Sequence, residues 1–191
     1  MVATEGRPAR EPETFRALLE AATCRRADAL RALYDAFGGR VCAYLRWRGA
    51  ADPDDLTNEV FSRAFRHLDR FTGSEADFTA WVFTIARRLL VDEHRRASRR
   101  PVTVELAPQV GDAIAGGDTE AEALTRVQED RLDELLASLT PDQREVIALR
   151  IIADLPIDRV ASVLGKDPGA VKALQHRGIA ALRRRLEKTT A

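Results

Sequence analysis

Residues 156–191 read PIDRVASVLGKDPGAVKALQHRGIAALRRRLEKTTA, and this stretch decides the fold of the C-terminal part of the chain. A short apolar run ends at Leu164 and meets Gly165, and Pro168 suits the first turn of a second, longer helix. A glycine in a tight turn between two helices is typical of a helix-turn-helix. The predicted inner face of the second helix consists of Val171, Leu174, Gly178 and Leu182.

Two more helices are predicted directly before this motif. Thr119 with Glu122, and Thr140 with Gln143, have the spacing of capping boxes, and apolar periodicity follows each pair. The apolar stripe of the second of these helices is predicted to contain Val146, Ile147, Leu149 and Ile151. Residues 101–118 are rich in Pro, Gly and small side chains and predict a flexible linker.

The N-terminal part predicts three or four packed helices between about residues 12 and 100. Asp52 can cap a helix that starts at Pro53, and its apolar stripe is Leu56, Val60, Ala64 and Leu68. The following helix has Phe78, Trp81, Val82, Ile85 and Leu89 on one face. The sequence therefore predicts an all-α protein of two small helical domains, residues 1–100 and 119–191, joined by a linker at residues 101–118.

Charge is distributed in blocks that the total conceals. The chain has 30 Lys plus Arg and 30 Asp plus Glu, a net charge of zero. Residues 87–100 carry six arginines and two acids, net +4, and residues 166–188 carry seven bases and two acids, net +5. Residues 101–145 carry eleven acids and three arginines, net −8. The two basic blocks are therefore candidate surfaces for a polyanion.

Several classes of protein are excluded or disfavoured. No apolar run approaches the roughly 18 residues of a membrane span, and Met1 begins no signal segment, so we expect no membrane insertion and a cytoplasmic location. Cys24 and Cys42 lie 18 residues apart without a CxxC motif, which disfavours a disulfide or zinc scaffold. No cofactor motif is present in the sequence, and we expect no cofactor and no bound metal.

Five segments in order resemble the extracytoplasmic-function (ECF) sigma factors of bacterial RNA polymerase, which belong to group 4 of the sigma-70 family. The segments are LYDAFGGRVCAYLRWRG, DPDDLTNEVFSRAFRHLDRF, FTAWVFTIARRLLVDEHRR, LTPDQREVIALRIIADLPIDRVASVLG and DPGAVKALQHRGIAALRRRL. The resemblance implies a region 2 bundle that binds core polymerase and the minus-10 element, and a region 4 helix-turn-helix that binds the minus-35 element. The implied function is promoter-specific transcription initiation without catalysis by the chain itself.

The resemblance also implies partners and the residues that bind them. The partners are core RNA polymerase (beta-prime clamp helices and beta flap), promoter DNA and an anti-sigma factor. The acidic helix start in DPDDLTNEVF is expected to face the clamp helices. The predicted polymerase contacts are Asp54, Asp55, Glu59 and Phe61. An alternative from the residues alone is that the first two acids only stabilise a helix N-terminus.

Contacts to the minus-10 element are expected around FTGSEADFTAWVFTIARRLLVDEHRR, where one strand is held open. Arginines follow phosphates, and stacking of a base on an aromatic ring contributes roughly 1 to 3 kcal/mol. The predicted contacts are Arg87, Arg88, Arg95, Arg96, Phe78 and Trp81. The two aromatic residues also lie on the apolar stripe, which favours a place in the core. Many relatives have Asn where Arg88 stands, so the preferred base does not carry over.

Contacts to the minus-35 element are expected from the N-terminal half of the last helix, which would enter the major groove. The predicted contacts are Lys166, Lys172, Gln175, His176 and Arg177. Many relatives have Thr, Ser and Arg where this chain has Ala170, Ala173 and Leu174, and Pro156 replaces a frequent Ser or Thr cap. The minus-35 sequence therefore does not carry over either.

Three alternative functions remain open at the level of sequence. A stand-alone helix-turn-helix regulator would bind operator DNA without polymerase, but it leaves the first hundred residues unexplained. A helical scaffold would have no salt-dependent affinity for DNA. A metal-dependent nuclease would need divalent cations held by carboxylates. Its candidate ligands are Asp52, Asp54, Asp55, Glu59, Asp92 and Glu93.

Overall fold

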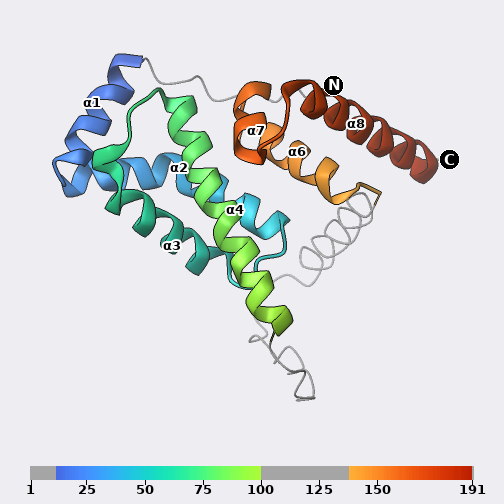
Figure 1. The fold of residues 1–191 in the computed structure, drawn as a ribbon, viewed down its shortest axis with the longest axis horizontal. Coiled ribbons are helices and arrows are strands. Elements are labelled where there is room, and N and C mark those ends of the chain that lie inside the picture. The colour runs from blue at the N-terminus through green and yellow to red at the C-terminus, as the bar shows by residue number, and fades with distance from the viewer. Residues whose placement is uncertain (1–11, 100–137, 191) are drawn as a thin grey trace, which may run out of the picture.

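The computed structural model describes residues 12–99 and 138–190, and the regular structure within these residues is entirely helical, as the sequence predicts (Figure 1). The N-terminal part contains α1 (Pro12–Thr23), α2 (Ala27–Trp47), α3 (Pro53–Arg66), the 3-10 helix η1 (Leu68–Arg70) and α4 (Glu75–Arg99). The C-terminal part contains α6 (Pro141–Ile151), α7 (Ile157–Leu164) and α8 (Pro168–Thr190). The predicted linker at residues 101–118 and the predicted helix start at Thr119 lie outside the described residues.

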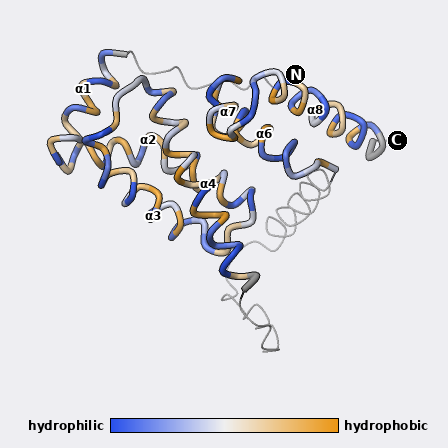
Figure 2. Tube along the Cα trace, in the orientation of Figure 1, coloured by the Kyte–Doolittle hydropathy of each residue, from blue (hydrophilic) through white to orange (hydrophobic). Residues whose placement is uncertain are grey.

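An aromatic cluster forms the centre of the N-terminal bundle. Phe78 of α4 has no exposed surface, and its ring centroid lies 5.1 Å from that of Phe37 in α2 and 5.8 Å from that of Phe15 in α1. Apolar segments, orange in Figure 2, occur on every helix of this bundle. Because large aromatic side chains bury the most apolar area per residue, these contacts fix the position of α4 against α1 and α2.

The helix starts that the sequence predicts at Asp52 and Thr140 are present in the structure. The Asp52 side chain accepts a hydrogen bond from the Asp55 backbone amide at 2.9 Å, with Pro53 as the first residue of α3. Thr140 and Gln143 form both hydrogen bonds of a capping box at the start of α6. Each cap pairs amides that the first turn of a helix leaves unbonded.

The C-terminal part folds as the predicted helix-turn-helix. Gly165 ends α7 in the left-handed region, at φ +62°. Val171 of α8 is fully buried, and α8 approaches α6 closely at Gly178, where a Cβ atom would lie 2.6 Å from Ile147 Cδ1. The close approach explains why an apolar face of this helix contains a glycine.

The prediction that Ile151 belongs to the buried stripe of α6 is wrong. Ile151 is 68% exposed, whereas the other three residues of the stripe are buried. The chain turns back at this end of the helix, and the Leu155 amide donates to the Leu149 carbonyl at 3.1 Å. Beyond this turn Leu155 is buried, with 1% exposure, whereas Ile151 faces solvent.

The two parts of the chain pack against each other. Helices α6 and α7 contact α2 and α4, and Figure 1 shows α7 beside the upper half of α4. Buried residues from both parts belong to one continuous apolar cluster, and Trp47 at the end of α2 packs against Leu139 and Ile147. A hydrogen bond from Arg40 Nη1 to the Ala153 carbonyl, at 3.3 Å, crosses the same contact.

Two glycine substitutions should change stability in opposite directions. Gly165→Ala places a side chain in the left-handed region and should lower the free energy of unfolding by about 1 kcal/mol. Gly39→Ala lies inside α2, where a Cβ atom meets nothing within 4 Å, and should raise it by about 0.5 to 1 kcal/mol. Urea unfolding followed by circular dichroism measures both. Equal shifts in the same direction would contradict the assignment of the turn.

Candidate functional site

The predicted polymerase-binding acids lie at two places on α3. Asp54 and Asp55 are exposed in its first turn, where carboxylates favour the helix N-terminus. Asp54 faces α2: Cys42 Sγ lies 3.4 Å from its Oδ1 and Arg46 Nη2 lies 3.9 Å from its Oδ2. Burial, together with the hydrogen bond to Asp54, raises the pKa of the Cys42 thiol above its usual range. The two aspartates remain available to a partner.

Glu59 lies with arginines of its own helix instead. Its Oε1 atom accepts from Arg63 Nε at 2.6 Å and lies 4.0 Å from Arg66 Nη2. The hydrogen bond from Arg63 lowers the pKa of the Glu59 carboxyl below its usual value. The structure therefore separates Glu59 from the two aspartates and places it beside arginines of α3.

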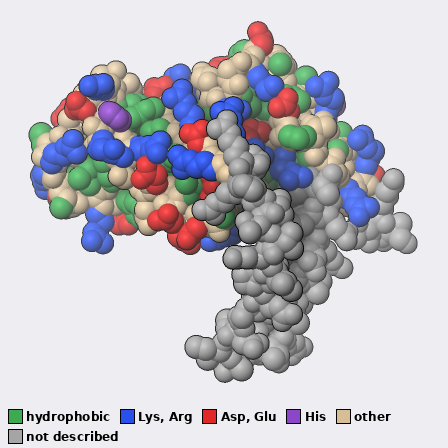
Figure 3. All heavy atoms as spheres, turned by 60° about the horizontal axis from the view of Figure 1, so that its bottom comes forward, with side chains coloured by type: hydrophobic (Ala, Val, Ile, Leu, Met, Phe, Trp, Pro, Cys, Tyr) green, Lys and Arg blue, Asp and Glu red, His purple; other side chains and the backbone are tan. Residues whose placement is uncertain are grey.

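An open hollow of about 530 Å³ lies between α3 and α4. Its lining residues are Glu59, Arg63, Arg66, His67, Trp81, Ile85 and Arg88. Figure 3 brings the lower side of the Figure 1 view forward and shows basic side chains in a band across the N-terminal bundle. One carboxylate against three arginines leaves an excess of positive charge, which suits a bound anion.

Trp81 is the aromatic residue that reaches this hollow. It is half-buried and stacks on Phe71, with centroids 5.2 Å apart and planes 19° apart. Phe78 packs edge-on beneath it at 5.9 Å. A flat, partly exposed ring beside arginines has the chemistry that stacks an unpaired base.

Two of the predicted contact residues are interior. Phe61 is 2% exposed and packs between Tyr34 and Phe65, and Phe78 has no exposed surface. A side chain enclosed in the core cannot reach a partner while the bundle stays folded. This corrects the expectation that Phe61 contacts polymerase and that Phe78 contacts DNA, because burial of their rings is what holds α3 and α4 in place.

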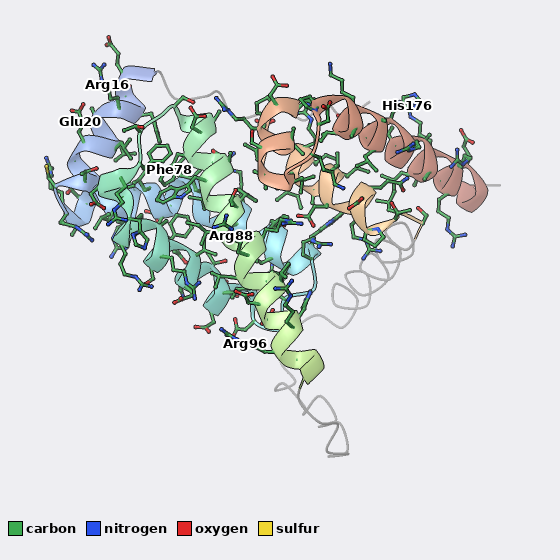
Figure 4. The ribbon with its side chains drawn as sticks, viewed as in Figure 1. Arg16, Glu20, Phe78, Arg88, Arg96 and His176 are labelled. Atoms are coloured by element: carbon green, nitrogen blue, oxygen red, sulfur yellow. The ribbon has the colours of Figure 1, made fainter. Side chains whose placement is uncertain are left out.

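The neighbouring arginines Arg87 and Arg88 of α4 face different parts of the molecule. Arg88 is exposed, lines the hollow and has no ion-pair partner among the described residues (Figure 4). Its neighbour Arg87 lies about 100° further round the helix, and its Nε atom lies 3.7 Å from Glu145 Oε1 of α6. Arg95 and Arg96 are exposed, two turns beyond the first pair. The sequence predicts one cluster, but Arg87 meets α6 whereas Arg88 lines the hollow.

The outer face of α8 presents the predicted minus-35 contacts. Lys172, His176 and Arg177 are exposed and Gln175 is half-buried, and Figure 4 shows His176 pointing away from α6. Asp167 Oδ1 accepts from the Gly169 amide at 2.9 Å and so orders the start of the helix. A helix with exposed cationic and amide side chains in its first turns can enter a major groove.

Lys166 is the predicted contact that already has a partner. Its Nζ atom lies 3.0 Å from Asp142 Oδ2 of α6, which ties the turn to the preceding helix. Ala170 and Ala173 are exposed positions of α8 that offer no polar group to a base edge. Base recognition by this helix therefore depends on few side chains.

Sequence reasoning missed two sets of residues. Arg63 and Arg66 line the hollow. The sequence contained a sign of this, because Arg63 follows Glu59 by four residues and so lies on the same face of the predicted helix. Tyr44, Arg48 and Glu145 form a buried cluster between the two parts of the chain. No local pattern indicates that cluster, because Tyr44 and Glu145 are 101 positions apart.

Burial and the neighbouring Glu145 carboxylate both raise the pKa of the Tyr44 hydroxyl far above its usual value. The hydroxyl therefore stays protonated throughout the physiological range and donates a hydrogen bond to Glu145 Oε1 at 2.5 Å.

Comparisons with known proteins agree with this arrangement. The family model for Sigma-70 region 2 matches residues 33–100, and that for Sigma-70 region 4 matches residues 129–182. The ECF RNA polymerase sigma factor BldN of Streptomyces coelicolor is 35% identical over 184 residues, covering 94% of this chain and 69% of that protein. The chain belongs to the ECF sigma factors. It is therefore an RNA polymerase sigma factor that acts in transcription initiation.

Further similarities place this sigma factor among its relatives. The ECF sigma factor SigD of Mycobacterium tuberculosis is 30% identical over 181 residues, covering 90% of this chain and 83% of that protein. The solved structure of CnrH in complex with the cytosolic domain of CnrY matches with a TM-score of 0.66 at 25% identity, covering 91% of this chain and 97% of CnrH.

Other features bear on the alternative functions. Sigma factors are not catalytic enzymes, and the described residues hold no group of three or more His, Cys, Asp and Glu placed to bind a metal ion. The regulator without polymerase is not favoured, because Sigma-70 region 2 matches residues 33–100, a part of the chain that this alternative leaves unexplained. In the described part of the chain, no helix combines the length and the apolar character needed to cross a bilayer.

Proposed function

We propose that this ECF sigma factor binds core RNA polymerase and the minus-10 element through residues 1–100, and the minus-35 element through residues 119–191, with a linker at residues 101–118. The observation that carries this proposal is the pair of separate basic surfaces, the hollow between α3 and α4 and the outer face of α8. The matches to Sigma-70 region 2 and region 4 fall on these two parts of the chain and support the division.

The minus-10 site is the hollow. Arg88 and Trp81 both line it, so that a base can stack on the indole while arginines neutralise the adjoining phosphates. Arg95 and Arg96 extend the basic surface along α4 toward the next phosphates of the strand. The guanidinium of Arg88 can also donate two hydrogen bonds to one base edge, which favours guanine among the four bases.

The minus-35 site is the outer face of α8. Lys172, Gln175, His176 and Arg177 span less than two turns of the helix, which is the length that one major groove accommodates. Lys166 supports the turn through Asp142. Since few side chains can donate to base edges here, we expect phosphate contacts to supply most of the affinity of region 4 for duplex DNA.

The polymerase contact is the exposed N-terminus of α3. Asp54 and Asp55 add two carboxylates to a turn that the Asp52 cap holds rigid, and their charge complements a basic partner surface such as the beta-prime clamp helices. Glu59 contributes to the hollow through its arginine partners and is not part of this contact in our proposal.

Charge reversal at α3 should impair polymerase binding. Asp54→Lys with Asp55→Lys should weaken affinity for core polymerase at least about tenfold, because like charges would then face each other across the interface. The control is Glu13→Lys with Glu20→Lys, two exposed acids of α1. Fluorescence anisotropy of labelled chain with core polymerase measures the affinity, and runoff transcription reports function. If the unaltered chain neither binds core polymerase nor supports promoter-dependent initiation, the proposed function is wrong.

The two DNA sites should separate by mutation. Arg88→Ala should weaken binding of the polymerase complex to a minus-10 non-template strand about five- to tenfold and leave minus-35 duplex binding within twofold. Lys172→Ala with Arg177→Ala should do the reverse and reduce the slope of log affinity against log salt by roughly two. The promoter used is one identified by mapping transcript starts after overexpression. Equal losses at both elements for either variant would contradict the assignment.

An anti-sigma factor is a further proposed partner. CnrH, which is similar over nearly the whole chain, was solved with the cytosolic domain of CnrY bound. We expect a protein of that class to bind this chain and to inhibit transcription in a purified system. A two-hybrid screen of fragments from the source genome tests this, and each interacting fragment is assayed for inhibition at equimolar concentration. Failure of every interacting fragment to inhibit would contradict the proposal.

A further inference from the structure

Two arginines of α3 that line the hollow are held in place by hydrogen bonds from their Nε atoms. Arg63 Nε donates to Glu59 Oε1 at 2.6 Å, and Arg66 Nε donates to the Ser62 carbonyl at 3.3 Å. Because a guanidinium group carries five N–H donors in one plane, a bond at Nε sets the orientation of that plane and leaves the terminal Nη donors for a ligand.

The hollow keeps an excess of positive charge although it contains a carboxylate. Glu59 Oε1 lies 2.6 Å from Arg63 Nε and 4.0 Å from Arg66 Nη2. Three arginines and this one carboxylate leave the lining residues with a net charge of +2 when His67 is neutral. The hollow therefore attracts an anion that carries more than one charge.

A terminal phosphate group matches this charge better than the phosphodiester of a DNA strand. The phosphodiester carries one negative charge, whereas a terminal phosphate carries about 1.5 to 2 at pH 7. Arginine binds phosphate oxygens through two parallel N–H donors, which gives both affinity and orientation. Arg63 and Arg66 therefore form a candidate site for the phosphates of a free nucleotide.

The α4 side of the hollow has the chemistry of a base site. Trp81, Ile85 and Arg88 follow one another at spacings of four and three residues and so share one face of the helix. Side chains on a helix lean toward its N-terminus, which brings Arg88 toward the ring of Trp81. An aromatic ring with a guanidinium group nearby can stack a base and donate hydrogen bonds to its edge.

The size of the hollow suits a small molecule. Its volume of about 530 Å³ lies within the range of roughly 300 to 1,000 Å³ that is usual for ligand sites. Cationic side chains come from α3, whereas the aromatic ring comes from α4. A nucleotide has the same two parts, a charged phosphate group and a planar base.

We propose that the hollow also binds a free guanine nucleotide, with its base on Trp81 and its di- or triphosphate on Arg63 and Arg66. Arg88 can donate two hydrogen bonds to the O6 and N7 atoms of guanine, and adenine offers no such pair of acceptors. The nucleotide and the minus-10 strand then compete for one surface. The competition rests on the proposed function, whereas binding of the nucleotide does not.

Calorimetric titration of the full-length chain without polymerase tests the binding. Guanosine diphosphate should bind at least about tenfold more tightly than guanosine, because the nucleoside lacks the charged hydrogen bonds to phosphate. It should bind at least about threefold more tightly than adenosine diphosphate, because of the two bonds from Arg88. Inorganic pyrophosphate should bind at least about threefold more weakly than guanosine diphosphate, because it has no base to stack.

Substitutions in the hollow separate the phosphate site from the base site. Arg63→Ala with Arg66→Ala should weaken binding of guanosine diphosphate at least about tenfold. Arg88→Ala should remove the preference for guanosine over adenosine diphosphate. The control is Arg16→Ala with Arg31→Ala, two exposed arginines of α1 and α2 outside the lining of the hollow, which should stay within twofold of the unaltered chain. Circular dichroism checks that each variant stays folded.

Competition needs no variant. The polymerase complex is titrated with a labelled minus-10 strand in the presence of guanosine diphosphate at ten times its dissociation constant. The apparent affinity for the strand should fall about tenfold, while binding of a minus-35 duplex stays within twofold.

The outcomes separate this inference from the proposed function. Absence of binding at millimolar guanosine diphosphate would overturn the inference, and so would equal binding by the unaltered chain and the Arg63→Ala, Arg66→Ala variant. Equal affinity for pyrophosphate and the nucleotide would overturn the base site. Nucleotide binding that leaves the affinity for the minus-10 strand unchanged would overturn the shared surface. Loss of promoter-dependent initiation by the unaltered chain would instead overturn the proposed function, and calorimetry would still report on the nucleotide.

Discussion

Burial of Phe78 against Phe15 and Phe37 fixes helix α4, and the rest of the structure depends on where α4 lies. One side of this helix forms the hollow with α3, through Trp81 and Arg88. The side that carries Arg87 and Asp77 receives the C-terminal part of the chain. A single packing constraint therefore positions both the candidate DNA surface and the surface that contacts region 4.

The distribution of charge follows from this geometry. The net charge of zero comes from basic and acidic blocks, and the structure shows acids placed directly against arginines of other elements, as with Glu145 and Arg48 or Asp77 and Arg159. Neutralisation within the molecule lowers the positive potential that a phosphate backbone would meet. Arg88 and the basic residues on the outer face of α8 keep their charge toward solvent.

Sequence patterns predicted the local structure well, and for a physical reason. The caps at Asp52 and Thr140 and the turn at Gly165 involve residues within three or four positions of one another. Periodicity also identified Val171 and Gly178 as inward-facing, because a helix that must bury one face repeats that face in its sequence. It failed at Ile151, which is exposed at the end of α6 where the chain turns back.

The candidate sites were predicted as residue types in the right elements, but not as contacts. Phe61 and Phe78 have the chemistry of a contact residue and lie in the core instead. Arg87 and Arg88 are adjacent and chemically identical, yet one meets α6 and the other lines the hollow. Only the packing of distant helices distinguishes them.

The sequence by itself determined the helices, their caps, the helix-turn-helix and the family, because these depend on near neighbours and on the order of segments. The tertiary structure alone decided that Glu145, one acid within a strongly acidic block, would be buried against Tyr44, Arg48 and Arg87. The partners of that carboxylate are about 60 to 100 positions away in the chain, and a charge at such a separation acquires its environment only when the two parts of the protein pack together.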